Sequence, residues 1–285
     1  MEGAGTPTLA IIGAGRAGSA LAIAAFDAGY RVAAVASRRG EMAARLAGTV
    51  GARAVATPLA AVVRADVTLL AVPDGAISTV AASIAASGVA LHGRGVVHLG
   101  ARFGPEIIAS LRVTGAEVGV LHPLQALAGP DSASLLEGAF FRVDAPGMLR
   151  QRLLSLVAAL RATPLEIDPG AAALYHAAAV LAGNAPLALL AEATRLLESA
   201  GVNAETAHAA LAALLEGAAH NARRAGPAAA LTGPVARGDR DAIAAHLDAL
   251  AVHPDARELY LTLTRAMESL LATEPVAGDG TAQVA

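Results

Sequence analysis

Cysteine and tryptophan are both absent from the 285 residues of this chain. Without cysteine there is no disulfide framework, no thiolate metal site and no cysteine nucleophile. Strong positive charge is also lacking, since the formal net charge is -3 at pH 7. Nucleic acids and anionic membrane surfaces bind to concentrated positive charge. We therefore expect neither a nucleic acid nor a membrane among the main partners of this protein.

Lysine is absent too, so that every basic side chain apart from histidine is arginine. The first residues lack a basic stretch that leads into an apolar one, and we expect no signal peptide. A chain without cysteine fits a reducing compartment, so the expected location is cytoplasmic. The length of the chain is sufficient for two domains with cores of their own.

Formal charge is missing from a long internal stretch as well. No Asp, Glu or Arg stands between Asp168 and Glu192, and this run exceeds the roughly 18 residues that mark a candidate membrane span. It contains a histidine, an asparagine and, in mid-run, a proline, which are costly or disruptive in lipid. The run therefore predicts a buried helix of a soluble core or of a dimer interface.

The first half of the chain alternates short β-branched runs with helical segments, which is the pattern of a parallel sheet covered by helices on both faces. Helices are expected at 17–29, 105–115 and 148–163, and a short run, PLEID, ends at Asp168. The predicted strands begin at Leu9, Arg31, Arg53, Asp66, Gly95, Ala116 and Ala139. The predicted fold class is therefore α/β, with a Rossmann-type, doubly wound and mainly parallel sheet.

The second half follows a different pattern. After Pro169 the hydrophobic period is helical almost throughout, and segments rich in Gly, Pro and Asn interrupt it. Asn203 and Asp239 stand where helix N-caps are expected, so capping is their simplest role. We predict a Rossmann dinucleotide-binding domain over residues 1–168 and an all-helical C-terminal domain over residues 169–285.

A glycine pattern, G-x-G-x-x-G, follows the first predicted strand and opens the next helix. The first glycine permits a tight turn, the second lets a pyrophosphate approach the backbone, and the third lets the helix pack closely on the strand. The alternative is an ordinary turn in a chain rich in Gly and Ala. The predicted cofactor contacts are Gly13, Ala14, Gly15, Arg16, Ala17 and Gly18.

The end of the second strand predicts which dinucleotide binds. NAD-selective sites carry an Asp or Glu there for the ribose 2′-hydroxyl, whereas this chain has Ser37, Arg38 and Arg39. A hydroxyl and guanidinium groups bind a 2′-phosphate, which a carboxylate would repel. We therefore expect NADP(H). If these arginines are only solvated surface residues, the choice between NAD and NADP stays open.

Polar residues also follow three later strands, and ligands of such sheets lie beyond the carboxyl ends of the strands. Each of these residues has an alternative role as a turn residue or helix cap. The residues are Val72, Pro73, Asp74, His98, His122 and Gln125. We expect Val72, Pro73, Asp74 and His98 to contact the cofactor.

With these segments in hand, the chain resembles a group of Rossmann-like proteins that carry a C-terminal domain known as DUF2520, within the superfamily of 6-phosphogluconate dehydrogenase-like reductases. The resemblance rests on GAGRAGSAL, VPDGAI, VVH, HPLQ, YHAAAVLAGN and above all LTGPVARGDRDAIAAHLDAL, and it spans nearly the whole chain. Some relatives are similar to an alternative class of ketopantoate reductase, which implies NADPH-dependent reduction of a branched 2-keto acid. The resemblance also implies a homodimer through the helical domain, whose first long helix borders the nicotinamide site.

The same resemblance leaves the general acid open. In several relatives a Lys and an Asn one turn apart on this helix bind the substrate carbonyl. Asn184 resembles that Asn, but Val180 stands where the Lys would be. A histidine is then the expected proton donor, either His176 or His122, of which the first has an alternative role in the core and the second in a turn. Pro186 predicts a kink next to Asn184.

A small loop, LTGPVARGD, lies where pyrroline-5-carboxylate reductases, to which the chain is similar here, bind the substrate carboxylate. Thr232, Gly233 and Arg237 are the predicted carboxylate contacts, and Gln125 is a further predicted substrate contact. The alternative role of Arg237 is an intersubunit or capping salt bridge with Asp239 or Asp241.

Two functions are compatible with these residues. The first is an NADPH-dependent reductase of a small carboxylate-bearing carbonyl compound, with ketopantoate as the leading substrate and an imine fitting nearly as well. The second is a catalytically silent NADP(H)-binding sensor or partner-binding protein, which the missing lysine favours. A metal-dependent hydrolase is disfavoured, because no H-x-x-x-H or acid-flanked histidine cluster occurs. We expect no metal site.

Overall fold

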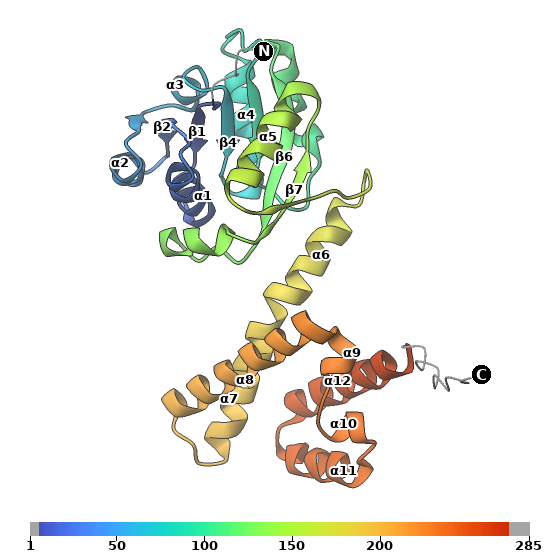
Figure 1. The fold of residues 1–285 in the computed structure, drawn as a ribbon. Helices are drawn as coiled ribbons and strands as arrows, with labels where there is room; N and C mark the ends of the chain where they lie inside the picture. The colour runs from blue at the N-terminus through green and yellow to red at the C-terminus, as the bar shows by residue number, and fades with distance from the viewer. Residues whose placement is uncertain (1–5, 274–285) are drawn as a thin grey trace, which may run out of the picture. The chain divides into compact units, whose positions relative to one another are not determined.

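The computed structural model describes residues 6–273 of the chain (Figure 1). The chain divides into two compact units, Met1–Asn184 and Ala185–Ala285. The first unit contains the predicted sheet and also the helix that follows it, α6 (Ala172–Gly183). The domain boundary that we expect between residues 168 and 169 stays a prediction.

The first unit is built on an eight-stranded sheet with the order β3-β2-β1-β4-β5-β6-β7-β8. Its neighbouring strands are parallel except for β6 and β7, which are antiparallel. The strands are β1 (Leu9–Ile12), β2 (Val32–Ala36), β3 (Arg53–Val55), β4 (Val67–Leu70), β5 (Gly95–His98), β6 (Glu117–Leu124), β7 (Phe140–Asp144) and β8 (Thr163–Leu165). The predicted Rossmann-type sheet, mainly parallel, is confirmed.

Helices cover both faces of this sheet. One hydrophobic cluster joins the sheet to α1 (Arg16–Asp27), α2 (Gly40–Thr49) and α5 (Gly147–Ala159). The other joins it to α3 (Pro58–Val62), α4 (Asp74–Ala85) and the 3-10 segment η1 (Pro105–Thr114), which was predicted as an ordinary helix. A further 3-10 segment, η2 (Pro130–Leu136), packs against α1. The apolar strands are therefore buried on both sides, as the doubly wound fold requires.

Side-chain alternation along β6 and β7 places His122 and Arg142 on the same face of the sheet. Leu121 and Phe141 are buried in the cluster under α1 and α5. Because successive residues of a strand point to opposite faces, their neighbours His122 and Arg142 point to the other face. These two residues are also register partners across the two strands.

The second unit is helical throughout its described residues, which confirms the predicted helical C-terminal region. Asn203 and Asp239 accept hydrogen bonds from the amides of Thr206, at 2.9 Å, and Ala242, at 3.1 Å, and both are the N-caps that the sequence predicts. The segments are α7 (Ala185–Ser199), α8 (Ala204–Ala225), α9 (Pro227–Ala230), α10 (Pro234–Arg237), α11 (Arg240–Ala249), the 3-10 segment η3 (Leu250–Val252) and α12 (Pro254–Thr273).

The uncharged run forms α6 and α7, which are interrupted at Asn184 two residues before Pro186. An interruption there agrees with the prediction, because proline has no N–H for the carbonyl of Ala182. Only Ala172 is buried in α6, and no residue is buried in α7. The predicted burial of this run in the core of one chain is therefore wrong, and its burial in a dimer interface stays a prediction. Ala172–Ser199 is also long and apolar enough to cross a membrane, and one such helix is a weak indication by itself.

Candidate active site

The glycine turn after β1 is closed so tightly that two of its positions have no room for a side chain. Gly13 has a φ of +111°, and a Cβ there would lie 2.2 Å from the carbonyl oxygen of Ala71. A Cβ on Gly18 would lie 2.0 Å from the carbonyl oxygen of Gly13. At Gly15 an added Cβ meets no atom within 4 Å, so this position is open to a ligand. The three glycines thus have the separate roles that a dinucleotide turn requires.

The backbone amides that follow this turn are free to bind an anion. Helix α1 begins at Arg16, and no side chain of the described residues caps it. The first amides of a helix have no partner within the helix and carry its positive dipole end. Ala14 is buried beneath the turn, while Arg16 is exposed beside it. The turn therefore has the local structure that the pattern predicts, and its free amides fit a pyrophosphate, while the contact of these residues with the cofactor stays a prediction.

The end of β2 offers donors and no acid. Ser37 is half-buried, and Arg38 and Arg39 are exposed on the way into α2. The first acidic residue is Glu41, in the first turn of that helix. A 2′-phosphate would meet a hydroxyl and two guanidinium groups here, so the residues present fit the phosphate of NADP(H).

Two predicted contacts at the ends of β4 and β5 have partners within the protein. Asp74, which follows the exposed Pro73 and the half-buried Val72, is ion-paired with Arg102 at 3.0 Å. His98 is fully buried, and its Nδ1 accepts the amide proton of Gly100 at 3.1 Å.

The other nitrogen of His98, Nε2, donates to the carbonyl of Gly104 at 3.0 Å. Burial lowers the pKa of His98, which agrees with a neutral ring that uses both nitrogens on the loop after β5. Contact of His98 with a cofactor stays a prediction.

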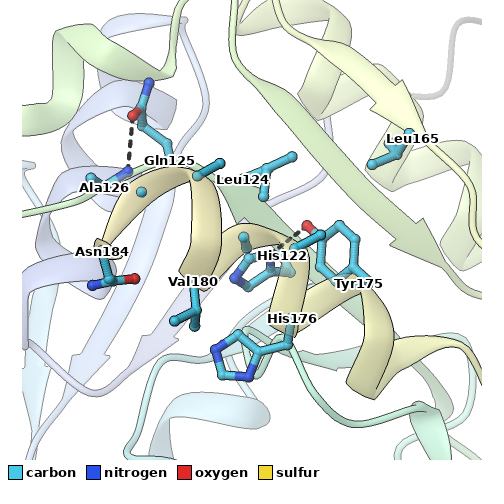
Figure 2. A pocket seen from close by; sticks show the side chains of 13 residues that line it. His122, Leu124, Gln125, Ala126, Leu165, Tyr175, His176, Val180 and Asn184 are labelled. Carbon is cyan, nitrogen blue, oxygen red and sulfur yellow. Dashed lines mark hydrogen bonds between the residues drawn. The ribbon is translucent and has the colours of Figure 1, made fainter. Parts of the chain in front are cut away.

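A cavity of about 610 Å³ lies in the first unit between the end of β6 and helix α6. This volume is within the range of small-molecule sites. Figure 2 shows the side chains that line it. Most of the lining is apolar, and its polar members come from β6 and α6 and from the residue that directly follows each of them. They are His122, Gln125, Tyr175, His176 and Asn184.

His122 and Tyr175 form the best-defined polar pair of this cavity. The His122 Nδ1 and the Tyr175 hydroxyl are 2.8 Å apart, and the two rings meet edge to face with centroids 5.5 Å apart. Burial, with His176 and Arg142 nearby, lowers the pKa of His122 to about 4. Burial also raises the pKa of Tyr175 to about 12. The pair is therefore a neutral imidazole beside a neutral phenol at neutral pH.

Arg142 lies behind this pair. It is buried, and its Nη1 donates to the carbonyls of Ala101, at 3.0 Å, and Phe103, at 2.9 Å. Its Nη2 pairs with Asp144 at 3.3 Å, and its Nε has no hydrogen-bond partner among the described residues. The guanidinium carbon is 5.9 Å from the ring centroid of Tyr175, a cation–π distance. A permanent positive charge therefore lies next to the phenol.

The other residues predicted for this site differ in their exposure and in their hydrogen bonds within the protein. Asn184 is exposed and lines the cavity, as does Val180 at the position where relatives are expected to carry Lys. His176 is half-buried in the same wall. The amide of Gln125 donates to the carbonyl of Leu135 at 3.1 Å and accepts from the amide of Ala126 at 2.8 Å. Gln125 therefore holds its own loop as well as lining the cavity.

The predicted carboxylate contacts belong to the second unit. Thr232 is exposed, and Gly233 has a φ of +90° and precedes helix α10. Arg237 is exposed, with its Nη2 4.0 Å from the Oδ2 of Asp239, which is one of the ion pairs foreseen for it. Their role in substrate binding stays a prediction.

Tyr175 and Arg142 are the residues that sequence reasoning missed. Tyr175 was visible as a polar residue in an uncharged run and as the first residue of YHAAAVLAGN, but no role was assigned to it. Arg142 was hidden, because its proximity to His122 depends on the register of two antiparallel strands. Among residues 6–273 no group of three His, Asp or Glu side chains is placed to hold a metal ion.

Comparisons with family models match both halves of the chain. Residues 8–101 match the model described as NADP oxidoreductase, coenzyme F420-dependent, and residues 139–267 match the domain of unknown function DUF2520. Among curated proteins none matches this chain. The predicted combination of a Rossmann domain with a DUF2520 domain is confirmed.

Solved structures share the fold over nearly the whole chain. A protein from Bacteroides fragilis assigned as an NADP oxidoreductase is 24% identical, with a TM-score of 0.72 over 92% of this chain and 98% of that one. A reductive aminase from Aspergillus terreus, in complex with NADPH and ethyl-5-oxohexanoate, is 23% identical, with a TM-score of 0.62 over 94% of each chain. A pyrroline-5-carboxylate reductase from Coxiella burnetii is 16% identical, with a TM-score of 0.60 over 94% of this chain and 98% of that one.

Proposed function

The chain is an NADP-dependent oxidoreductase that joins a Rossmann domain to a DUF2520 domain, and we propose that it reduces a small carboxylate-bearing carbonyl or imine compound with NADPH. The observation that carries this proposal is the cavity of about 610 Å³, whose polar groups come from β6 and α6. A mostly apolar cavity with a few polar groups is typical of a site for a small substrate. It lies in the same unit as the glycine turn.

The cofactor would be held by residues that the structure shows to be available. The turn from Gly13 to Gly18 would bind the pyrophosphate, and Ser37 with Arg38 and Arg39 would bind the 2′-phosphate. When bound, NADPH supplies a hydride to the substrate carbon, and the substrate oxygen or nitrogen then needs a proton. The chain must therefore place a proton donor at the cavity.

Roles in the cavity follow from the chemistry of its side chains. The exposed amide of Asn184 would orient the substrate carbonyl, and His122 or His176 would belong to the path that delivers the proton. Thr232, Gly233 and Arg237 do not line this cavity and belong to the second unit, and they remain the proposed contacts of a substrate carboxylate. Ketopantoate remains the leading keto-acid candidate. A cyclic imine is its rival, because two of the similar structures are a pyrroline-5-carboxylate reductase and a reductive aminase.

A silent sensor that binds NADP(H) without turnover is the second candidate. The observation that favours it is Val180, which lines the cavity where an acid-base side chain would be expected from the resemblance. This candidate predicts tight NADPH binding together with an inert cavity. It needs no proton donor.

Dimerisation and location complete the proposal. Helices α6 to α8 expose large apolar side chains, and exposed surfaces of this kind mark interaction sites. We propose that a second copy of this chain covers them and that the homodimer works in the cytoplasm. The most exposed of these side chains are Leu174, Leu181, Leu187 and Leu214.

The test is NADPH consumption by the pure protein against a panel of 2-keto acids and cyclic imines, ketopantoate and 1-pyrroline-5-carboxylate included. NADH serves as the control for the 2′-phosphate site. We expect turnover with at least one probe and a preference for NADPH. Tight NADPH binding with no turnover would favour the sensor, and no binding of either dinucleotide would contradict the assignment of the glycine turn.

A further inference from the structure

We propose that the hydroxyl of Tyr175 is the group that protonates the substrate, and that His122 returns a proton to it after each turnover. This inference deepens the proposed function and rests on it. It assigns a catalytic role to a residue that the sequence analysis left without one, and it makes His122 a relay in place of a direct acid.

The first argument is the position of the phenol. Tyr175 lies on the first turns of α6, lines the cavity, and reaches the Nδ1 of His122 from β6 at 2.8 Å (Figure 2). A neutral imidazole and a neutral phenol share two protons, and their hydrogen bond uses one of them. With the proton of His122 on Nδ1, that nitrogen donates to the phenol oxygen. The O–H of Tyr175 is then free to donate to a substrate.

The second argument is the protonation state of the pair. An acid must hold its proton at the working pH, and burial keeps Tyr175 in the phenol form far above neutrality. A histidine with its pKa lowered to about 4 is a neutral imidazole at pH 7 and lacks the acidic second proton of an imidazolium ion. His122 by itself is therefore a poor acid. The ionisable groups that act on His122 come from α6, β7, the start of α4 and β5. They are His176, Arg142, Asp74 and His98.

The third argument is the charge that stabilises the product of proton transfer. When Tyr175 gives up its proton, the electron pair of the broken O–H bond stays on the phenol oxygen. The guanidinium of Arg142, 5.9 Å from the ring, acts to lower the pKa of this phenol and so favours the phenolate. The Nδ1–H of His122 stabilises the same oxygen by a hydrogen bond. Arg142 is therefore a positioning residue that acts through Tyr175.

The relay balances in protons. The substrate oxygen or nitrogen gains the proton of Tyr175, and the two electrons of the reduction come from NADPH. The phenolate then takes the proton from Nδ1 of His122 while Nε2 takes a proton from a hydronium ion of the solvent, which leaves the neutral Nε2–H tautomer. Proton exchange with solvent water returns the ring to the Nδ1–H tautomer before the next turnover, so one proton enters the pair for each proton that leaves.

The test compares Tyr175→Phe with Tyr260→Phe, because the second unit contains a matched pair. His246 Nδ1 and the Tyr260 hydroxyl are also 2.8 Å apart, with ring centroids 5.7 Å apart and planes at 86°. Each substitution removes one hydroxyl and one hydrogen bond. Using the best probe of the panel, we expect kcat to fall by about 10²-fold or more in Tyr175→Phe. We expect Tyr260→Phe to stay within about twofold, and both variants to bind NADPH like the unmodified protein.

A second probe separates proton donation from substrate positioning. The N-methyl-1-pyrrolinium ion already carries its positive charge, so its reduction needs no proton. We expect Tyr175→Phe to reduce this probe at close to the normal rate while it fails on the keto acid, whose carbonyl oxygen needs a proton when it is reduced. Equal losses on both probes, or a normal kcat with the keto acid, would overturn the assignment of Tyr175.

The proposal has a readout that does not depend on turnover. In ¹⁵N spectra His122 should remain singly protonated from pH 9 down to pH 6, and a doubly protonated ring at pH 6 would overturn the relay in any case. If the unmodified protein binds NADPH but consumes no probe, the proposed function fails, and the catalytic role of Tyr175 fails with it. If it consumes a probe and Tyr175→Phe does so equally well, only the relay fails.

Discussion

The two compact units each contain a histidine and a tyrosine in almost the same geometry, and the difference lies in what surrounds each pair. His122 and Tyr175 border a cavity and have the buried Arg142 behind them. His246 and Tyr260 bridge α11 and α12, where His246 is exposed to solvent. A hydrogen bond of 2.8 Å is thus no sign of function by itself. Burial and a neighbouring charge are what change the proton affinity of the first pair.

The units differ in the same way as a whole. The first buries apolar side chains on both faces of a sheet, whereas the second buries few of its own, among them Ala207, Val235 and Leu250. A low-dielectric environment that shifts a pKa is therefore present in the first unit. Three substitutions with matched controls test this difference.

The largest effect is expected at the buried cation. Arg142→Met leaves the carbonyls of Ala101 and Phe103 without their donor and Asp144 without its partner, so the free energy of unfolding should fall by about 3 kcal/mol. Arg257, whose Nε donates to the carbonyl of Leu247 at 3.3 Å, is the control in the second unit.

Arg257 is exposed, so Arg257→Met should change the free energy of unfolding by less than about 0.5 kcal/mol. Urea denaturation followed by circular dichroism measures both variants. Equal losses would show that the buried guanidinium does not hold the loop after β5.

The next effect is the pH dependence of stability. His122 has a pKa of about 4 in the folded protein, below its ordinary value of 6.5, so the unfolded chain binds more protons between these values. This contribution to stability is complete above pH 6.5 and is lost progressively as the pH falls toward 4. Between pH 8 and pH 5 the loss is about 2 kcal/mol.

His122→Gln should remove this part of the acid sensitivity, and His246→Gln should leave it in place. Thermal or urea denaturation at several pH values is the measurement. If His122→Gln and the unmodified protein lose stability in parallel on acidification, the burial of a neutral His122 is wrong.

The smallest effect concerns the cofactor. Arg38→Ala should raise the dissociation constant of NADPH by about tenfold, because a charge-assisted hydrogen bond to the 2′-phosphate is lost. The affinity for NADH should not change. Arg237→Ala, in the second unit, is the control and should leave NADPH affinity unchanged in a fluorescence titration. A parallel loss of NADPH and NADH affinity in Arg38→Ala would place this side chain elsewhere than at the 2′-phosphate.

Much of the fold was predictable from the sequence because its signals are local. The seven predicted strands, the glycine turn and the caps at Asn203 and Asp239 each depend on residues within a few positions of one another. The eighth strand, β8, was not predicted, because three residues are too few to show the alternation of a strand. The 3-10 form of η1 was not predictable, since its apolar period also fits an ordinary helix. The exposure of α6 and α7 was missed because periodicity shows an apolar helix and does not show what covers it.

The candidate site was predictable only in part, for a related reason. His122, His176 and Asn184 carry side chains whose chemistry draws attention in any sequence, and the structure brings all three to one cavity. Tyr175 acquires its importance from the Nδ1 of a residue on another element, and Arg142 from strand register. Contacts of this kind arise from tertiary packing, which spacing along the chain does not show.

The measurement that tests the central claim most directly is the pH dependence of kcat from pH 6 to pH 9, with the best probe and saturating NADPH. A phenol whose pKa is raised to about 12 keeps its proton over this whole range, so the account predicts a kcat that stays level. A histidine with an ordinary pKa near 6.5 would lose its proton there. A kcat that falls about tenfold per pH unit above pH 7 would contradict the account and return the role of acid to a histidine.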